Sequence, residues 1–398
     1  KAFVLSLFEE QDPFRRAQAQ ARPAKQLVED GLARLESELR AEPALQAELM
    51  GDLGAVQINL GDLAGAEQTF QKALALQQAL AAPESLAVAR VEGFLARAEV
   101  QTGRLPEATA RLERALPVLE GGLGGDHAEV VALRRVQVRL LVNASRFEEA
   151  VETSRRVVAS YSRTRGQDDP ETAMALVVQG MALIELGRFA EAEGVLQDSV
   201  SRLERSRGSE HTQLVYPLMH LGNLRKRAGR TAEALEAIER VLALQEKSLG
   251  GGHVLVGRAK ADQGDLLRRL DRFEEADRTL GEAALILEPL RNQELGLLML
   301  YRGRLEMARG RFGEAERAFA RAETVYRATL GDSAVDTWGA RADRGEALAR
   351  QGRLAQGERL QREALDAVTR LAGEGSPAHR EVAEKVDQTR QMKTAAAR

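Results

Sequence analysis

Apolar residues recur at steps of three and four along most of this chain, and a glycine or polar residue interrupts the pattern at regular points. A representative stretch is QGMALIELGRFAEAEGVLQDSV, residues 179–200. Its apolar positions include Leu183, Ile184, Leu186, Phe189, Ala192, Val195, Leu196 and Val200. This spacing gives each of two helices one apolar face. Because glycine tolerates the left-handed conformation that commonly ends a helix, the stretch predicts a helical hairpin that turns at Gly187.

The hairpin repeats along the chain with a nearly constant period. A small residue early in the second helix marks each copy: Ala66, Ala108, Ala150, Ala192, Ala234, Ala276, Ala315 and Gly357. Successive markers are 42 residues apart five times, then 39, then 42, which gives eight units with one deletion of three residues. A period of this length is typical of stacked repeats. The pattern therefore predicts an all-α chain built as a repeat array.

Two further positions recur with the marker. Twelve residues before it, on the first helix, stand Gly54, Ala96, Val138, Gly180, Gly222, Gly264, Gly303 and Gly345. Seven residues after those, at the turn, stand Gly61, Gly103, Ser145, Gly187, Gly229, Asp271, Gly310 and Gly352. Small residues on both helices of a hairpin let the helices pack closely, where added bulk would force repacking.

The connector between hairpins holds the residues that look most like a reactive site. GGLGGDHAEV, residues 121–130, combines four glycines with Asp126 and His127, a set suited to cradling a phosphate or holding a metal ion. The position of His127 recurs every 42 residues, as Asp169, His211 and His253. Since packed helices lie roughly 10 Å apart, these side chains cannot share one ion. We predict that they begin helices, and we expect no catalytic residue, metal or cofactor.

The stretch LGAVQINLGDLAGAEQTFQKAL (53–74) and the stretch 179–200 resemble tetratricopeptide repeats (TPRs) in the spacing of their small and large residues. The longer unit and connectors such as LGGDHAEVVA (123–132) are similar to the kinesin-light-chain type. The resemblance implies a right-handed α-solenoid of eight tandem TPR hairpins over residues 46–372. Residues 1–45 would form a junction and an N-terminal helix, and residues 373–398 a C-terminal capping helix and tail.

The first 56 residues resemble the junction that follows the kinase and transmembrane segments of bacterial serine/threonine protein kinases. The matching residues are Phe3, Leu7, Phe8, Asp12 and Pro13. The chain begins at Lys1 and not at a methionine, so we expect it to be a piece of a longer protein. No apolar run reaches about 18 residues, so we expect no membrane insertion here and place any anchor upstream of Lys1.

The net charge and the cysteine content limit the classes of partner that the chain can bind. A net charge of −3 and a pI near 6.1 provide no positive field for nucleic acid. The absence of cysteine excludes disulfides and thiolate metal sites and suits a reducing compartment. We therefore expect an intracellular signalling context, with a protein or peptide as the partner.

The resemblance also implies where a partner binds, because TPR ligands contact the first helix of each unit in a concave groove. The corresponding positions of units four to seven include Met174, Val177, Met181, Ile184, Tyr216, Met219, Asn223, Lys226, Arg258, Arg268, Leu297, Leu300 and Arg304. Apolar residues dominate in units four, five and seven, and an apolar strip on a surface calls for a partner. The alternative is that neighbouring helices bury these positions.

These observations predict a non-catalytic scaffold that binds a protein or peptide, as the regulatory or sensor region of a bacterial serine/threonine kinase. The alternative is a structural array that dimerises or spaces another signalling protein, such as a nucleotide-switching ATPase.

Overall fold

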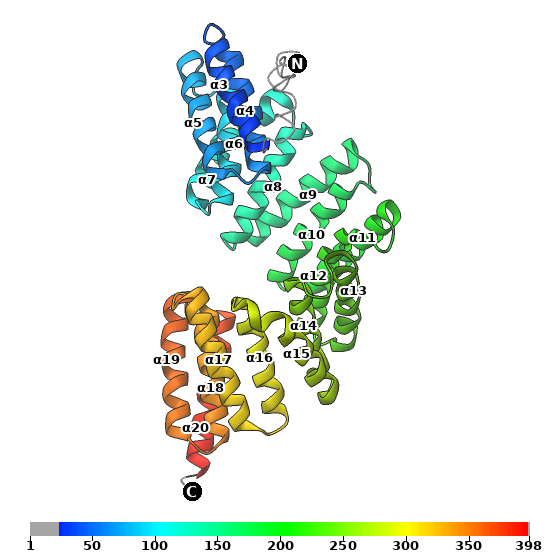
Figure 1. The fold of residues 1–398 in the computed structure, drawn as a ribbon, viewed down its shortest axis with the longest axis vertical. Coiled ribbons are helices and arrows are strands. Elements are labelled where there is room, and N and C mark those ends of the chain that lie inside the picture. The colour runs from blue at the N-terminus through cyan, green and yellow to red at the C-terminus, as the bar shows by residue number, and fades with distance from the viewer. Residues whose placement is uncertain (1–23, 397–398) are drawn as a thin grey trace, which may run out of the picture. The chain divides into compact units, whose positions relative to one another are not determined.

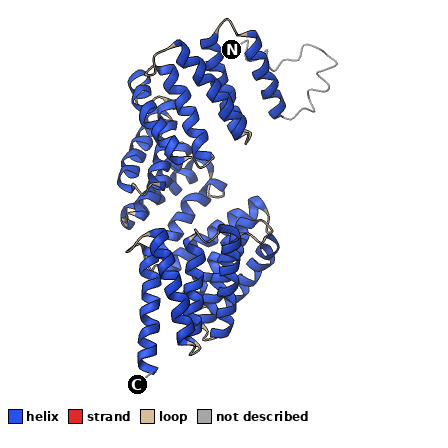
Figure 2. Cartoon of the chain, turned by 90° about the vertical axis from the view of Figure 1, so that its left-hand side faces the viewer, coloured by secondary structure: helices blue, strands red, loops and turns tan. Residues whose placement is uncertain are grey.

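The computed structural model describes residues 24–396, and every regular element in that range is a helix (Figure 2). The junction residues Phe3, Leu7, Phe8, Asp12 and Pro13 lie outside the described residues. Backbone contacts divide the chain into two units, residues 1–202 and residues 203–398. None of the helices described is long and apolar enough to cross a membrane.

The first unit is a succession of helices joined by short turns (Figure 1). Its helices are α3 (Ala24–Glu38), α4 (Pro43–Asn59), α5 (Leu63–Leu80), α6 (Leu86–Gln101), α7 (Leu105–Leu123), α8 (Ala128–Asn143), α9 (Phe147–Thr164), α10 (Pro170–Glu185) and α11 (Phe189–Arg207). The helices α4 and α5, α6 and α7, and α8 and α9 pack as hairpins. The predicted alternation of two helices per period is confirmed.

The second unit continues the same alternation. After the end of α11 come η1 (Thr212–Leu214), α12 (Val215–Arg227), α13 (Thr231–Leu249), α14 (Val254–Arg269), α15 (Phe273–Leu287), η2 (Glu288–Leu290), α16 (Gln293–Ala308), α17 (Phe312–Leu330), α18 (Val335–Arg350), α19 (Leu354–Ala372) and α20 (Pro377–Ala396). The hairpins are α12 with α13, α14 with α15, α16 with α17, and α18 with α19. Helix α20 packs on α18 and α19.

The even-numbered helices form the inner layer of each unit. In the first unit α4 contacts α6, α6 contacts α8 and α8 contacts α10, and in the second unit α14 contacts α16 and α18 contacts α20. Odd-numbered helices of successive hairpins make fewer such contacts among the described residues. A stack whose helices meet more closely on one side curves toward that side, so the even-numbered helices present the concave face of each unit.

The turn positions adopt the backbone that the sequence predicts. All six turn glycines have positive φ, between 73° and 81°. Ser145 and Asp271, which replace glycine in two units, have φ of 57° and 58°. This left-handed conformation is costly for residues with a Cβ atom, which explains why six of the eight turns carry glycine.

Close helix approach explains the small residues within each hairpin. A Cβ atom added to Gly180 would lie 2.7 Å from a methyl carbon of Leu196, and one added to Gly264 would lie 2.6 Å from Cγ of Leu280. The facing marker Ala192 is fully buried. These separations are well inside van der Waals contact, so the predicted role of the small residues in helix packing is confirmed.

The connector residues begin helices. His127, Asp169, His211 and His253 each accept a hydrogen bond from the backbone N–H two residues later, at 2.9 to 3.4 Å. Asn292 does the same at 3.1 Å, in the unit that follows the three-residue deletion. Such N-cap bonds satisfy backbone donors that the first turn of a helix leaves free. The prediction that these positions are helix starts is confirmed.

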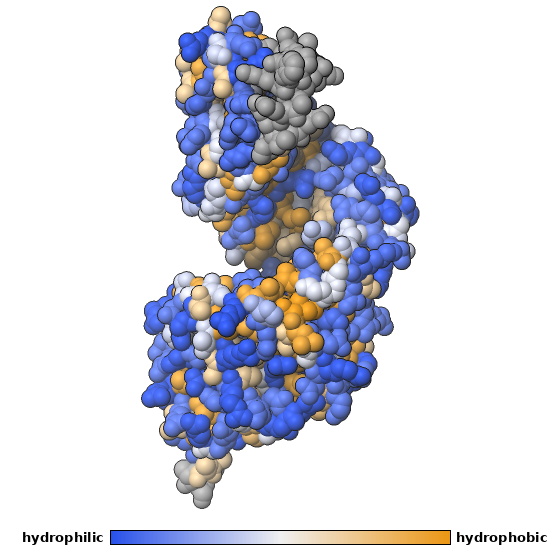
Figure 3. All heavy atoms as spheres, in the orientation of Figure 1, coloured by the Kyte–Doolittle hydropathy of each residue, from blue (hydrophilic) through white to orange (hydrophobic). Residues whose placement is uncertain are grey.

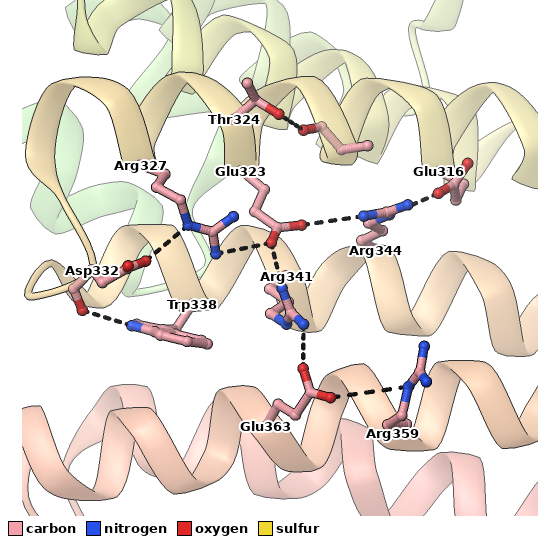
Figure 4. A network of polar contacts seen from close by, with 11 residues as sticks. Glu316, Glu323, Thr324, Arg327, Asp332, Trp338, Arg341, Arg344, Arg359 and Glu363 are labelled. Carbon is pink, nitrogen blue, oxygen red and sulfur yellow. Dashed lines mark hydrogen bonds and ion pairs between the residues drawn. The ribbon is translucent and has the colours of Figure 1, made fainter.

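A buried carboxylate ties three successive helices of the second unit together (Figure 4). Glu323 on α17 is 3% exposed and accepts hydrogen bonds from Arg341 on α18 at 2.7 Å and from Arg327 at 3.1 Å. Arg341 also reaches Glu363 on α19. Trp338, the only tryptophan of the chain, lies beneath Arg327 and Arg341 and donates to the backbone of residue 332. The arrangement ties consecutive helices together through contacts between residues 18 and 22 positions apart.

Candidate binding surfaces on the inner helices

The predicted groove residues of the fourth repeat, in the first unit, differ in how exposed they are. Met174 and Met181 on α10 are partly exposed. Val177 and Ile184 are 3% and 2% exposed. The expectation that Val177 and Ile184 contact a ligand is wrong, because both side chains are buried. They belong to the core of the stack.

In the second unit the predicted groove residues come together around one pocket. Met219, Asn223 and Lys226 on α12, Arg258 on α14 and Leu297 on α16 all line a cavity of about 290 Å³. Met219 is 37% exposed at its edge. These five residues come from three inner helices, and we call this cavity the second-unit pocket. Leu255, Asp262 and Tyr301 also line it, and the sequence did not single them out.

Four other predicted residues lie outside the second-unit pocket. Tyr216 is 54% exposed on the first turn of α12. Leu300 is partly buried and packs against the core. Arg268 binds the buried carboxylate of Asp265 at 2.8 Å, and Arg304 lies 3.7 Å from Asp343.

Leu300, Arg268 and Arg304 thus have structural contacts, and their contact with a ligand stays a prediction. A buried carboxylate needs a cation or several donors to offset its lost hydration. Asp265 is 1% exposed and Asp343 is 5% exposed, so Arg268 and Arg304 serve the interior of the second unit. Leu300 fills space between hairpins.

A polar pair forms the floor of the second-unit pocket. The hydroxyl of Tyr301 on α16 donates a hydrogen bond to Asp262 on α14 at 2.8 Å. Burial raises the pKa of Asp262, although the Lys226 ammonium and the Tyr301 hydroxyl both act against that rise. Burial also raises the pKa of Tyr301 well above its usual value, and the Asp262 carboxylate adds to that effect. The pair places a fixed polar group among the apolar and polar side chains that line the pocket.

Two residues that line the second-unit pocket each keep one buried polar atom without a hydrogen-bond partner in residues 24–396. These atoms are Oε1 of Gln245 and Nε of Arg258. The first is an acceptor and the second is a donor. An unmet buried donor or acceptor costs about 1–3 kcal/mol.

A second cavity lies on the inner face of the first unit, and the sequence analysis missed it. It has a volume of about 480 Å³ and is lined by residues of α6, α8, α9 and α10, and we call it the first-unit pocket. Arg97, Arg135 and Arg139 stand around it, and Met181 is the one predicted groove residue that reaches it. Arg97, Arg139 and Met181 occupy the same place in three consecutive repeats, 42 residues apart. This 42-residue spacing was the feature of the sequence that could have identified the pocket.

Apolar surface gathers on the face of each unit that Figure 3 shows, around α8 and α10 in the first and around α12 and α14 in the second. The second-unit pocket and the first-unit pocket are formed by these same inner helices. Among residues 24–396 no group of three or more His, Asp or Glu side chains could hold a metal ion.

Hairpins that turn at a positive-φ residue every 42 positions and stack through small residues define a helical repeat protein of the TPR class. The chain belongs to the tetratricopeptide repeat family: the MalT-like TPR region matches residues 128–331, which is 204 of 398 residues. Tetratricopeptide repeat models also match residues 45–121 and 338–363. The chain is thus a TPR scaffold, of a class that binds protein or peptide partners. No curated protein sequence matches it.

Two of the following solved structures have TM-scores above 0.5 and share the fold, and the first is similar at a lower score. A kinesin-light-chain-like protein of Podosopora anserina with nearly identical TPR-like repeats is 24% identical, with 51% of this chain and 95% of that chain covered and a TM-score of 0.45. A Rap protein complexed with competence and sporulation factor is 13% identical over 89% of this chain and 100% of that chain, with a TM-score of 0.54. The STAND protein PH0952 of Pyrococcus horikoshii, with a tetratricopeptide repeat sensor, is 12% identical over 92% of this chain and 55% of that chain, with a TM-score of 0.57.

Proposed function

We propose that this chain is a non-catalytic scaffold that binds a segment of another protein, in extended or helical form, in the second-unit pocket. The observation that carries the proposal is an apolar rim beside polar side chains that line the same pocket. Met219, Leu255 and Leu297 supply the rim, and Asn223 and Lys226 supply polar groups. A peptide matches both, because it carries apolar side chains on a backbone with alternating donors and acceptors.

The chemistry of the rim favours an adaptable ligand surface. Methionine has three rotatable bonds and a polarizable sulfur, so Met219 can adjust to side chains of different shapes. Lys226 lines the same pocket and adds a cation at its edge. A segment with one or two large apolar residues and a nearby acidic residue therefore fits the pocket best.

We further propose that the chain is the regulatory or sensor region of a bacterial serine/threonine protein kinase. The junction resemblance at Phe3, Leu7, Phe8, Asp12 and Pro13 supports this context. In that organisation residues 46–372 form eight repeats, residues 1–45 connect them to the upstream part, and residues 373–398 cap the last repeat.

The likeness to a STAND protein with a tetratricopeptide repeat sensor favours one alternative, a structural or sensing array of a nucleotide-switching ATPase. The reading frame upstream of Lys1 separates the two. A kinase catalytic loop followed by an apolar segment of about 20 residues supports the kinase context. A nucleotide-binding P-loop would refute it and favour the ATPase.

Binding is tested with Met219→Glu. A peptide-display library is selected on the full chain, and the affinities of the selected peptides are measured by fluorescence anisotropy. Burying a methionine-sized side chain contributes about 1.5–3 kcal/mol, so Met219→Glu should weaken binding about tenfold or more. Leu285→Glu is the matched control, because Leu285 is 80% exposed on the outer helix α15 of the same unit.

Circular dichroism shows whether each variant is folded. If Met219→Glu unfolds, Met219 belongs to the core, and Met219→Ala then measures the loss of the side chain alone. Equal affinity of the selected peptides for wild type, Met219→Glu and Leu285→Glu would place binding on another surface.

A further inference from the structure

The first-unit pocket carries a charge pattern that no structural role explains. Three arginines line it, and none of its lining residues is a carboxylate. The chain as a whole has a net charge of −3, so a purely cationic pocket is a local feature. All its lining residues fall between positions 97 and 181, within the first unit, and none is shared with the second-unit pocket.

Only one of the three arginines is neutralised within the described part of the chain. Arg135 on α8 binds Glu171 on α10 at 2.6 Å. Arg97 on α6 and Arg139 on α8 have no ion pair or hydrogen bond among residues 24–396. Elsewhere on the inner faces, partly buried arginines such as Arg268 and Arg304 face carboxylates. Arg97, which is partly buried, and Arg139, which is exposed, differ in this respect from Arg268 and Arg304.

The surroundings of Arg97 make its charge unfavourable in the free protein. Burial lowers the pKa of Arg97, and the like charge of Arg135 lowers it further. A guanidinium remains protonated in proteins, so the cost is carried as free energy of the charged state. An anion that binds between Arg97 and Arg139 would remove part of that cost and would replace lost hydration with charge-assisted hydrogen bonds.

Most other residues that line the pocket are apolar, and Gln101 and Ser154 are the remaining polar ones. Side chains that form its floor are Val136, Val138, Val142, Val157, Val178 and Met181. A free inorganic anion would use the arginines and leave this floor hydrated. Nucleic acid is also disfavoured, because no aromatic side chain lines the pocket for base stacking. A peptide that carries both carboxylates and large apolar side chains matches the arginines and the floor together.

We propose that the first-unit pocket binds an acidic, apolar segment of a partner protein. In this complex carboxylate side chains pair with Arg97 and Arg139, and a neighbouring leucine- or phenylalanine-sized side chain lies on the valine and methionine floor. Arg135 keeps its pair with Glu171 and lines the entrance. The site is independent of the proposed peptide site in the second unit.

The test uses the full chain and an array of fluorescein-labelled, acetylated and amidated nonapeptides. Every member carries two glutamates and two large apolar residues within Gly and Ser flanks, in all orders, for example GSLEELFGS. Matched arrays replace both glutamates by glutamine or both apolar residues by alanine. Binding is measured by anisotropy at low and at high salt.

We expect the best acidic member to bind more weakly to the double variant Arg97→Gln, Arg139→Gln, by about tenfold or more, since charge-assisted contacts are the strong ones. The control is Arg156→Gln, which removes one charge from the outer helix α9 of the same unit and should leave binding unchanged. Both matched arrays should bind weakly, and salt should reduce binding of the acidic array. If Arg97→Gln disturbs folding, Arg139→Gln alone carries the test, because Arg139 is exposed.

Four outcomes would overturn the proposal. They are the absence of any binding member in the acidic array, equal binding of the glutamine array, equal binding to the double variant, and competition by inorganic phosphate as strong as that by unlabelled peptide. The last outcome would indicate a simple anion site. Peptides selected for the second-unit pocket report on that site separately, because Met219→Glu and the arginine variants change different pockets.

Discussion

Replacing Gly264 by alanine tests whether hairpin packing limits the size of the residue on the inner helix. Gly264 lies in the interior of α14, and an added Cβ would meet Cγ and Cδ2 of Leu280 at 2.6 and 2.7 Å. Nonbonded carbon atoms prefer about 3.5–4.0 Å, so one of the helices or the leucine must move by roughly 1 Å. Leu280 is fully buried, which leaves its side chain little room to rotate away.

Gly281 on α15 provides the matched control, because a Cβ added there meets nothing within 4 Å. Both substitutions gain the helix propensity of alanine over glycine, about 0.5–1 kcal/mol. Only Gly264→Ala adds overpacking, which typically costs about 1–3 kcal/mol. We therefore expect Gly281→Ala to stabilise the second unit slightly, and the free energies of unfolding of the two variants to differ by about 1–3 kcal/mol.

Urea unfolding followed by circular dichroism measures the difference, and hydrogen exchange locates it. In a repeat array each unit contacts only its neighbours, so lost amide protection should concentrate in α14, α15 and the adjoining hairpins. If the two alanine variants were equally stable, close packing at the small first-helix positions would not limit side-chain size. Uniform loss of protection over the whole chain would argue against the repeat-by-repeat energetics assumed here.

Two further predictions concern the ion pairs. Hydrogen bonds from Arg163, and next from Ser160, lower the pKa of Asp126 from 3.8 to about 2. A carboxyl group with a depressed pKa stabilises the fold fully above the pKa it has in the unfolded chain, and this stabilisation is lost as pH falls toward 2. The urea midpoints of wild type and Asp126→Asn should therefore differ above pH 3.8 and converge near pH 2. A difference between the two midpoints that stays constant with pH would contradict this. Glu323→Gln weakens the hydrogen bonds of the buried carboxylate with Arg327 and Arg341 and should cost about 1–3 kcal/mol. The fluorescence emission of Trp338, which stacks on both arginines, should change in the same variant. If neither the emission nor the stability changes, the contacts drawn in Figure 4 do not stabilise the fold.

The sequence determined most of the secondary structure and the order of the repeats. A helix depends on residues three and four positions apart, and a turn depends on one left-handed residue. An N-cap depends on a side chain two residues before the backbone donor that it binds. All three features can therefore be recognised from short stretches of sequence. Gly187, Ser145 and His127 adopted the conformations and roles expected from such patterns. The 42-residue period then indicated that the same unit is stacked repeatedly.

Exposure on the inner helices was decided only by the tertiary structure. Val177 and Ile184 have the spacing of groove residues, yet both are buried. The Tyr301 and Asp262 pair joins residues 39 positions apart, and Arg135 and Glu171 are 36 apart. Whether a side chain meets a carboxylate, a core or solvent depends on how successive hairpins cross, and no local pattern encodes that crossing. For this reason Arg97 and Arg139 were recognisable as unpaired cations around a pocket only after the helices were placed.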